Sequence, residues 1–170
     1  LEEKLAAIHE ALYAQLDFVD RISVAAYDRA TDLLKTFLAS SPGRNDLVRH
    51  EARLAELPSL AEILRTGHSR VVNDLGIFHK GSHVHTRILE EEGYRSSYTF
   101  PMYLDGSFWG FIFFNSRTSG RLSASALRVL DVHAHLISAV VTAEMFAVRV
   151  LAAAVKTADP NMELDAEAEV

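Results

Sequence analysis

Apolar residues recur at helical spacing at both ends of this chain. Near the N-terminus they are separated by four, three and four positions, at Leu1, Leu5, Ile8 and Leu12. This spacing places apolar side chains on one face of an amphipathic helix, and it predicts a helix over residues 1–17. A longer pattern of the same kind predicts a second helix over residues 123–156, in which Ser123 or Ser125 caps the first turn.

Between these two helices the chain has the pattern of strands. Residues 18–27 and 33–38 are rich in β-branched and aromatic side chains and are separated by a polar spacer, which predicts a hairpin. Residues 95–104 and 107–115 carry the strongest strand pattern. The Asp105-Gly106 dipeptide between them is typical of a tight hairpin turn.

The middle of the chain is patterned more weakly. Residues 49–57 have a helical composition. Ser59, followed three positions later by Glu62, fits the capping box of a short helix that Gly67 ends. Residues 71–72 are a candidate short strand.

Length and charge narrow the class of protein. The 170 residues include 23 acids and 17 bases, a net charge of −6. One domain over residues 1–158 can bury a core at this length, whereas residues 159–170 have no packing pattern and are expected to be a disordered tail or a linker. The acidic balance argues against a nucleic-acid partner. The apolar stretch 129–148 contains Asp131 and Glu144, so we expect a cytoplasmic domain without membrane contact.

The chain has no cysteine. A disulfide framework, a thiolate metal site, a cysteine nucleophile and any group tethered through sulfur are therefore excluded.

Three phrases in the strand region resemble the pattern of the GAF domain family. They are Glu92-Gly93-Tyr94-Arg95-Ser96-Ser97-Tyr98-Thr99-Phe100-Pro101-Met102, Leu104-Asp105-Gly106 and Trp109-Gly110-Phe111-Ile112-Phe113-Phe114-Asn115-Ser116. The family pattern is a glycine and a serine before a strand that ends in proline and an aliphatic residue, then an acidic or glycine turn, then a strand with an early glycine. The resemblance implies an α+β fold with a central antiparallel sheet of five or six strands. Its terminal helices would cover one face, and variable helices and loops the other.

The resemblance also implies a function. GAF-like domains are mostly non-catalytic sensors that bind a cyclic nucleotide, a tetrapyrrole or another small molecule, form a homodimer and regulate an attached output domain. Here the output domain is expected to be a bacterial phosphodiesterase, cyclase or kinase. A covalently bound bilin is excluded by the lack of cysteine, and the Asn-Lys-x-Asp-Glu signature of mammalian cyclic-nucleotide-binding members is absent. The alternative is a GAF module without a pocket, which only holds two output domains together.

The ligand implied by the family would lie beneath the variable helices and loops. In the strand over residues 95–104, small hydroxyl side chains alternate onto one face, where they could serve as polar anchors among aromatic residues. The predicted ligand-binding residues are Asn73, Asp74, His79, His83, His85, Ser97, Thr99 and Tyr103.

Histidines suggest a second hypothesis of another class. Residues 73–85 form a polar loop, followed by a candidate helix over residues 84–92. His79 and His83 would share one face of a helix, but Gly81-Ser82 between them disfavours a helix, so we do not expect a haem or metal site. A small hydrolytic or redox enzyme would have to use the His79–His85 loop, because the sequence specifies no nucleophile with a base and no phosphate loop.

Both predicted terminal helices carry apolar seams at heptad spacing. In the second helix the seam continues past the expected edge of the sheet, and Glu144 interrupts it. An apolar stripe that extends beyond its own domain needs a partner. We therefore predict a homodimer that forms through Leu5, Ile8, Leu12, Leu130, Ile137, Val141, Val148 and Leu151.

Overall fold

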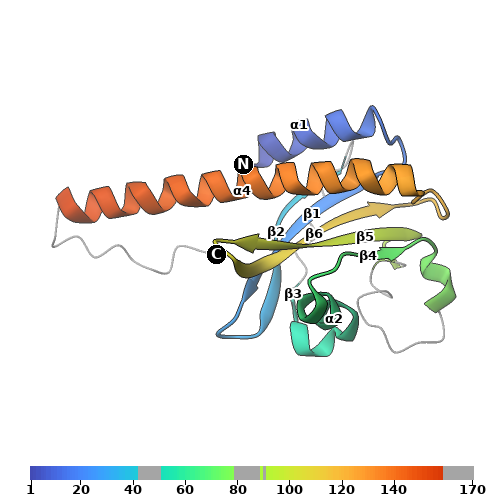
Figure 1. The fold of residues 1–170 in the computed structure, drawn as a ribbon, viewed down its shortest axis with the longest axis horizontal. Coiled ribbons are helices and arrows are strands. Elements are labelled where there is room, and N and C mark those ends of the chain that lie inside the picture. Colours follow the sequence, from blue (N-terminus) through green and yellow to red (C-terminus); the bar gives the residue numbers. More distant parts are fainter. Residues whose placement is uncertain (42–50, 79–88, 90, 159–170) are drawn as a thin grey trace.

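One antiparallel sheet forms the centre of the fold (Figure 1). The computed structural model describes residues 1–41, 51–78, 89 and 91–158. The strands of this part of the chain are β1 (Arg21–Asp28), β2 (Leu33–Ser40), β3 (Glu51–Arg53), β4 (Arg70–Val72), β5 (Ser96–Leu104) and β6 (Ser107–Ser116). They make a six-stranded sheet in the order β3-β2-β1-β6-β5-β4, so that β1 and β6 are its central pair.

Helices cover the two faces of the sheet. The terminal helices α1 (Glu2–Tyr13) and α4 (Ala124–Ala158) pack together on one face. The helix α2 (Pro58–Thr66) and the short 3-10 helices η1 (Leu54–Glu56) and η2 (Leu75–Phe78) lie on the other side. The predicted α+β fold is therefore confirmed, with terminal helices on one face and the variable elements opposite.

The larger core lies between the sheet and the terminal helices. Met102 of β5 and Ile112 of β6 are fully buried there, together with Leu12 of α1 and Leu130 of α4. Full burial of one such side chain contributes about 1.5–3 kcal/mol. The helical spacing of the apolar residues in α1 and α4 is thus used to cover the sheet.

Two bulges interrupt the strand pairing, one in β2 and one in β6. Phe37 is an extra residue of β2 between two pairs with β1, and Trp109 is an extra residue of β6 between two pairs with β5. The two rings meet edge to face, with centroids 5.6 Å apart. At the neighbouring Gly110, a Cβ atom would lie 1.9 Å from the carbonyl oxygen of Ala25. Only glycine permits this approach of the β1 and β6 backbones.

Two predicted turns are confirmed by their backbone angles. Asp105 and Gly106 both have positive φ, at 50° and 75°, as the tight hairpin turn requires. Gly67 ends α2 in the left-handed conformation, with φ at 69°, and its amide donates to the Ile63 carbonyl.

Two predictions for the middle of the chain are wrong. Residues 51–53, expected to be helical, form β3, because their backbone pairs with β2 and only Ala52 of the three turns inward. Ser59 is not a cap: the N-cap is Leu57, and Pro58, whose missing amide suits the first turn, occupies the first helical position. Glu62 instead accepts hydrogen bonds from Arg65.

His9 of α1 is buried and ties this helix to the sheet. Its Nε2 lies 2.8 Å from the Val19 carbonyl oxygen, and its Nδ1 lies 2.9 Å from the Ser40 hydroxyl. Because a carbonyl can only accept, Nε2 carries the proton and Nδ1 accepts from Ser40 in the neutral ring. Burial lowers the pKa of His9 below its usual value of 6.5, although the hydrogen bond to the Val19 carbonyl opposes the shift.

We expect Gly110→Ala to destabilise the protein by about 3 kcal/mol or more, because the new methyl group must displace the β1 backbone. Urea unfolding measures the change. Ser107→Ala, at an exposed position of the same strand, is the matched control. A Gly110→Ala protein as stable as this control would contradict the close approach.

We expect the free energy of unfolding to fall as the pH drops below 6.5, because the unfolded chain then binds a proton that folded His9 does not. Above that pH the ring is neutral in both states, and the contribution is constant. His9→Gln should flatten this part of the profile in urea titrations between about pH 8 and pH 5. His68→Gln removes an exposed imidazole as the control. An identical slope in wild type and His9→Gln would refute the assignment.

Candidate functional site

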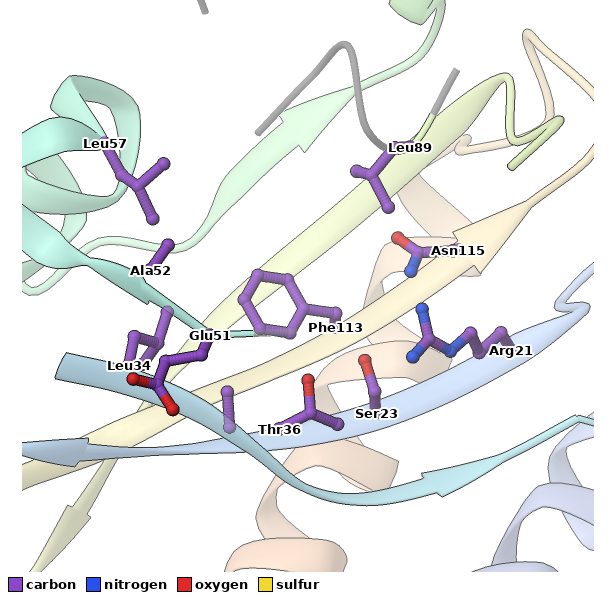
Figure 2. Close-up of a pocket in the computed structure, with 11 residues that line it drawn as sticks. Arg21, Ser23, Leu34, Thr36, Glu51, Ala52, Leu57, Leu89, Phe113 and Asn115 are labelled. Carbon is purple, nitrogen blue, oxygen red and sulfur yellow. The ribbon is translucent and has the colours of Figure 1, made fainter. Parts of the chain in front are cut away.

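A partly open cavity of about 70 Å³ lies on the α2 side of the sheet (Figure 2). Strands β1, β2, β3 and β6 supply most of its lining; Leu57, between η1 and α2, and Leu89, before β5, complete it from the variable side. The lining residues are Arg21, Ser23, Ala25, Leu34, Thr36, Glu51, Ala52, Leu57, Leu89, Phe113 and Asn115.

Strand register brings polar residues together at one end of this cavity. Arg21 pairs with Asn115, and Asn115 pairs with Ser97, so these three side chains form a row across β1, β6 and β5. In the next row Ser23 pairs with Phe113, and Phe113 pairs with Thr99. Because directly opposed residues point to the same face of a sheet, both rows face the variable elements.

Hydrogen bonding fixes the orientation of the Asn115 amide. The Ser97 hydroxyl donates to Asn115 Oδ1 over 2.8 Å, and both side chains are buried. The amide nitrogen of Asn115 is thereby directed toward the guanidinium of Arg21 and the Ser23 hydroxyl (Figure 2). Among the described residues, no group bonds to Asn115 Nδ2 or to Ser23 Oγ. The end of the cavity therefore presents hydrogen-bond donors that face one space.

Arg21 is the charged group of this end. Its side chain is only 6% exposed, and its Nη1 lies 3.4 Å from Glu92 Oε2. The segment that contains Glu92 is also held by Arg117, whose Nη1 donates to the Glu92 carbonyl and whose guanidinium lies 5.0 Å from the centre of the Tyr94 ring. The Arg21–Glu92 pair thus links β1 to the segment that leads into β5.

The opposite end of the cavity is apolar. Phe113 of β6 and Leu34 of β2 form its floor, and Leu57 approaches from the variable side, whereas Leu89 lies nearer Asn115 (Figure 2). The lining beside Leu34 also includes Glu51, whose Oε2 lies 3.4 Å from Lys35 Nζ (Figure 2). A few polar groups at one end of an apolar cleft are typical of a small-molecule site.

The ligand-binding residues predicted from sequence do not line this cavity in the described part of the chain. Asn73 instead binds the backbone amide and carbonyl of Leu122, and Asp74 accepts from the Gly76 amide. Tyr103 is 41% exposed near the hairpin turn. Ser97 and Thr99 do face the variable elements. Ser97 orients the Asn115 amide by donating a hydrogen bond to its Oδ1.

Three predicted residues, His79, His83 and His85, lie outside the described residues. The candidate helix over residues 84–92 lies largely outside them as well. Within the described ranges, no three His, Asp or Glu side chains gather as a metal site would require.

Sequence reasoning missed the residues that do line the polar end. Arg21 and Ser23 alternate with the apolar residues Ile22 and Val24, so the period-two pattern of β1 already places two polar side chains on one face. Asn115 is a polar residue near the end of a strand that is rich in aromatic residues. Each pattern could have been read as a polar position on the sheet, but the sequence does not show that the polar residues of β1 and β6 meet.

On the other face, Tyr98 is a buried polar group with a partner. Its hydroxyl donates to Asp131 of α4. Burial and this hydrogen bond both raise the pKa of the Tyr98 phenol. His133 and His135 of α4 lie within hydrogen-bond distance of backbone carbonyls of their own helix. These groups therefore connect α4 to the sheet and its own backbone, away from the cavity.

Five residues of the predicted dimer interface are instead buried within one chain. Their apolar side chains pack in the core between the sheet and the terminal helices: Leu5, Leu12, Leu130, Ile137 and Val141. Ile8 is half-buried, whereas Val148 and Leu151 are 60% and 65% exposed. Glu144 forms an ion pair with Lys4 of α1.

By length and composition alone, residues 124–156 are apolar enough to cross a membrane. The first half of α4 nevertheless belongs to the domain core, because Leu130, Ile137 and Val141 pack against the sheet. Placing this helix in a membrane would expose the sheet it covers.

Comparison with known proteins identifies the fold. The GAF domain family model matches residues 1–141. The structure is similar to the phycocyanobilin-bound GAF domain from a cyanobacterial phytochrome, with 15% identity, 83% of this chain and 84% of that chain covered, and a TM-score of 0.65. The structure is also similar to a red/green cyanobacteriochrome in its red light-absorbing state, with 15% identity, 85% of this chain and 96% of that chain covered, and a TM-score of 0.67.

A domain of a putative two-component sensor histidine kinase protein from Sinorhizobium meliloti 1021 is also similar, with 17% identity, coverage of 88% and 97%, and a TM-score of 0.61. Among curated proteins the search finds no match. Because the family model covers most of the chain and the sheet with its helices has the same architecture as these structures, the chain belongs to the GAF domain family.

Proposed function

We propose that this chain is a non-catalytic sensor that binds a small molecule in the cavity between the sheet and α2, and that it regulates an attached output domain in bacterial signal transduction. The observation that carries the proposal is the cavity itself, in which buried donors from β1 and β6 face an apolar end. Membership of the family supports the same idea, since GAF domains are typically sensory or regulatory parts of signalling proteins such as phytochromes and sensor kinases.

A bilin such as the one named for the cyanobacterial phytochrome does not fit this chain. No cysteine is present to tether it. The cavity of about 70 Å³ is also well below the roughly 300–1,000 Å³ of pockets that hold drug-sized ligands. The site therefore suits a molecule much smaller than a tetrapyrrole.

Helix α4 is the element that would carry a signal out of the domain. Its last buried core residue is Val141, and the helix continues to Ala158. The part of α4 after Val141 is therefore about 25 Å long at the usual helical rise. Figure 1 shows this half of α4 projecting past the sheet. Val148 and Leu151 continue the seam of the buried half on an exposed surface.

We propose that this exposed seam pairs with the same seam of a second chain in the cytoplasm. Two output domains would then follow directly from two neighbouring helices, and a change of helix packing could reach both of them. A ligand can bias that packing only if it binds the two arrangements with different affinity. A GAF module without a ligand would retain this second role alone.

To test for a ligand, the protein is purified gently and weighed by native mass spectrometry, before and after denaturation. We expect a mass excess that denaturation removes. Ala52→Leu, which fills the cavity from β3, should abolish the excess, while Ala55→Leu at an exposed position of η1 should keep it. An excess that survives Ala52→Leu would place the ligand elsewhere. No excess, and no response to added small molecules, would favour the module without a ligand.

To test the dimer, Val148 and Leu151 are both replaced by glutamate. We expect a shift from dimer to monomer in light scattering, because charges in an apolar helix seam must be desolvated for the chains to pair. Val150→Glu is the control, since it lies about 200° around the helix from Val148. Circular dichroism checks the fold. An unchanged mass of the double variant, or a monomeric wild type, would refute pairing through this seam.

A further inference from the structure

The polar end of the cavity is built to receive an anion. We propose that it binds a small organic monocarboxylate on Arg21, and that the ligand displaces the carboxylate of Glu92 from this arginine. This inference rests on the proposed function, because it names the chemistry of the molecule that the cavity would sense.

Charge and hydrogen-bond direction define the ligand's polar group. The Arg21 guanidinium is fixed in the cavity wall at 6% exposure, and its planar fork matches a carboxylate. Asn115 Oδ1 already accepts from Ser97, so the amide presents only its NH₂ group to the cavity. The Ser23 hydroxyl is free to donate among the described residues. Three donors and one positive charge thus face one small space.

Glu92 is the internal competitor for this charge. Its Oε2 lies 3.4 Å from Arg21 Nη1, longer than the 2.7–2.9 Å or so of a strong charge-assisted hydrogen bond. A ligand carboxylate that adds contacts with Ser23 and Asn115 can take the place of Glu92 on the buried guanidinium. Binding therefore exchanges one carboxylate for another on Arg21.

That exchange has a structural consequence. The Arg21–Glu92 contact joins β1 to the segment that enters β5, and a ligand on Arg21 would release it. Arg117 would still hold the Glu92 carbonyl and the Tyr94 ring. The backbone at Glu92 therefore stays attached through Arg117 when its side chain leaves Arg21.

The remainder of the cavity selects the rest of the ligand. Phe113, Leu34 and Leu57 favour a short hydrocarbon tail. Glu51 lies at the far end and carries a negative charge, although Lys35 pairs with it. A second carboxylate would approach this acid, so a monocarboxylate is favoured over a dicarboxylate.

The test uses three probes on the complete 170-residue chain at constant ionic strength: butyrate, its neutral analogue butyramide, and the dicarboxylate succinate. Binding is followed by NMR at the Asn115 side-chain amide and the Gly93 backbone amide, and by the thermal unfolding midpoint. The variants are Arg21→Gln and Glu92→Gln. The matched controls are Arg65→Gln and Glu62→Gln, which alter an exposed ion pair on α2.

We expect saturable binding of butyrate at both NMR positions, with butyramide and succinate at least roughly tenfold weaker. Glu92→Gln should tighten butyrate binding by roughly three- to tenfold, because the competitor loses its charge. Arg21→Gln should weaken it by roughly thirtyfold or more. The α2 variants should bind as wild type does. Glu92→Gln leaves Arg21 in place, so its gain in affinity cannot come from a failure to fold.

Three results would overturn the carboxylate proposal: equal binding of butyrate and butyramide, an unchanged affinity in Glu92→Gln, or no response of the Asn115 amide to butyrate. The proposed function fails separately. If butyramide moves the Asn115 signal, or if native mass spectrometry finds a mass excess that Ala52→Leu removes, the sensor remains and only the ligand class is wrong.

Discussion

The pairing of β1 with β6 is the contact on which the rest of the structure depends. It joins two segments about ninety residues apart at the centre of the sheet; β2 and β3 extend the sheet beyond β1, and β5 and β4 extend it beyond β6. The backbones approach so closely at Gly110 that no side chain fits between them. The same register sets Arg21 opposite Asn115, so the closure of the sheet also assembles the polar end of the cavity.

The two faces of this sheet are used for different purposes. The face beneath α1 and α4 is filled with large apolar side chains, and its buried polar groups, such as His9 and Tyr98, have hydrogen-bond partners. The opposite face is incompletely filled: near the ends of β1 and β6, small and polar side chains replace aliphatic ones. A rigid apolar layer on one side thus supports a polar hollow on the other, which is the arrangement that a binding site needs.

The two halves of helix α4 also differ in what they contact. Its first half completes the core, whereas the half beyond Val141 has no sheet to cover. The heptad seam runs through both halves without a change in spacing, and this continuity led the sequence pattern to assign all of it to one interface. The structure separates them, because the seam residues of the first half are buried in the chain's own core, whereas Val148 and Leu151 are exposed.

The sequence by itself determined the elements whose patterns are local. The terminal helices follow from apolar residues at helical spacing, the β5–β6 hairpin from Asp105-Gly106 between two apolar strands, and the end of α2 from Gly67. The phrases around that hairpin also sufficed to indicate the GAF family. The strand β3 was missed because three residues become a strand only through the partner that pairs with them.

Only the tertiary structure decided where the candidate site lies. Arg21, Ser23 and Asn115 are far apart in sequence and meet through strand register, which no local pattern encodes. The polar loop residue Asn73, which looked like a ligand anchor, is used to hold the start of α4 through Leu122. A polar side chain shows in the sequence that it needs partners, but the fold chooses between a ligand and the protein's own backbone.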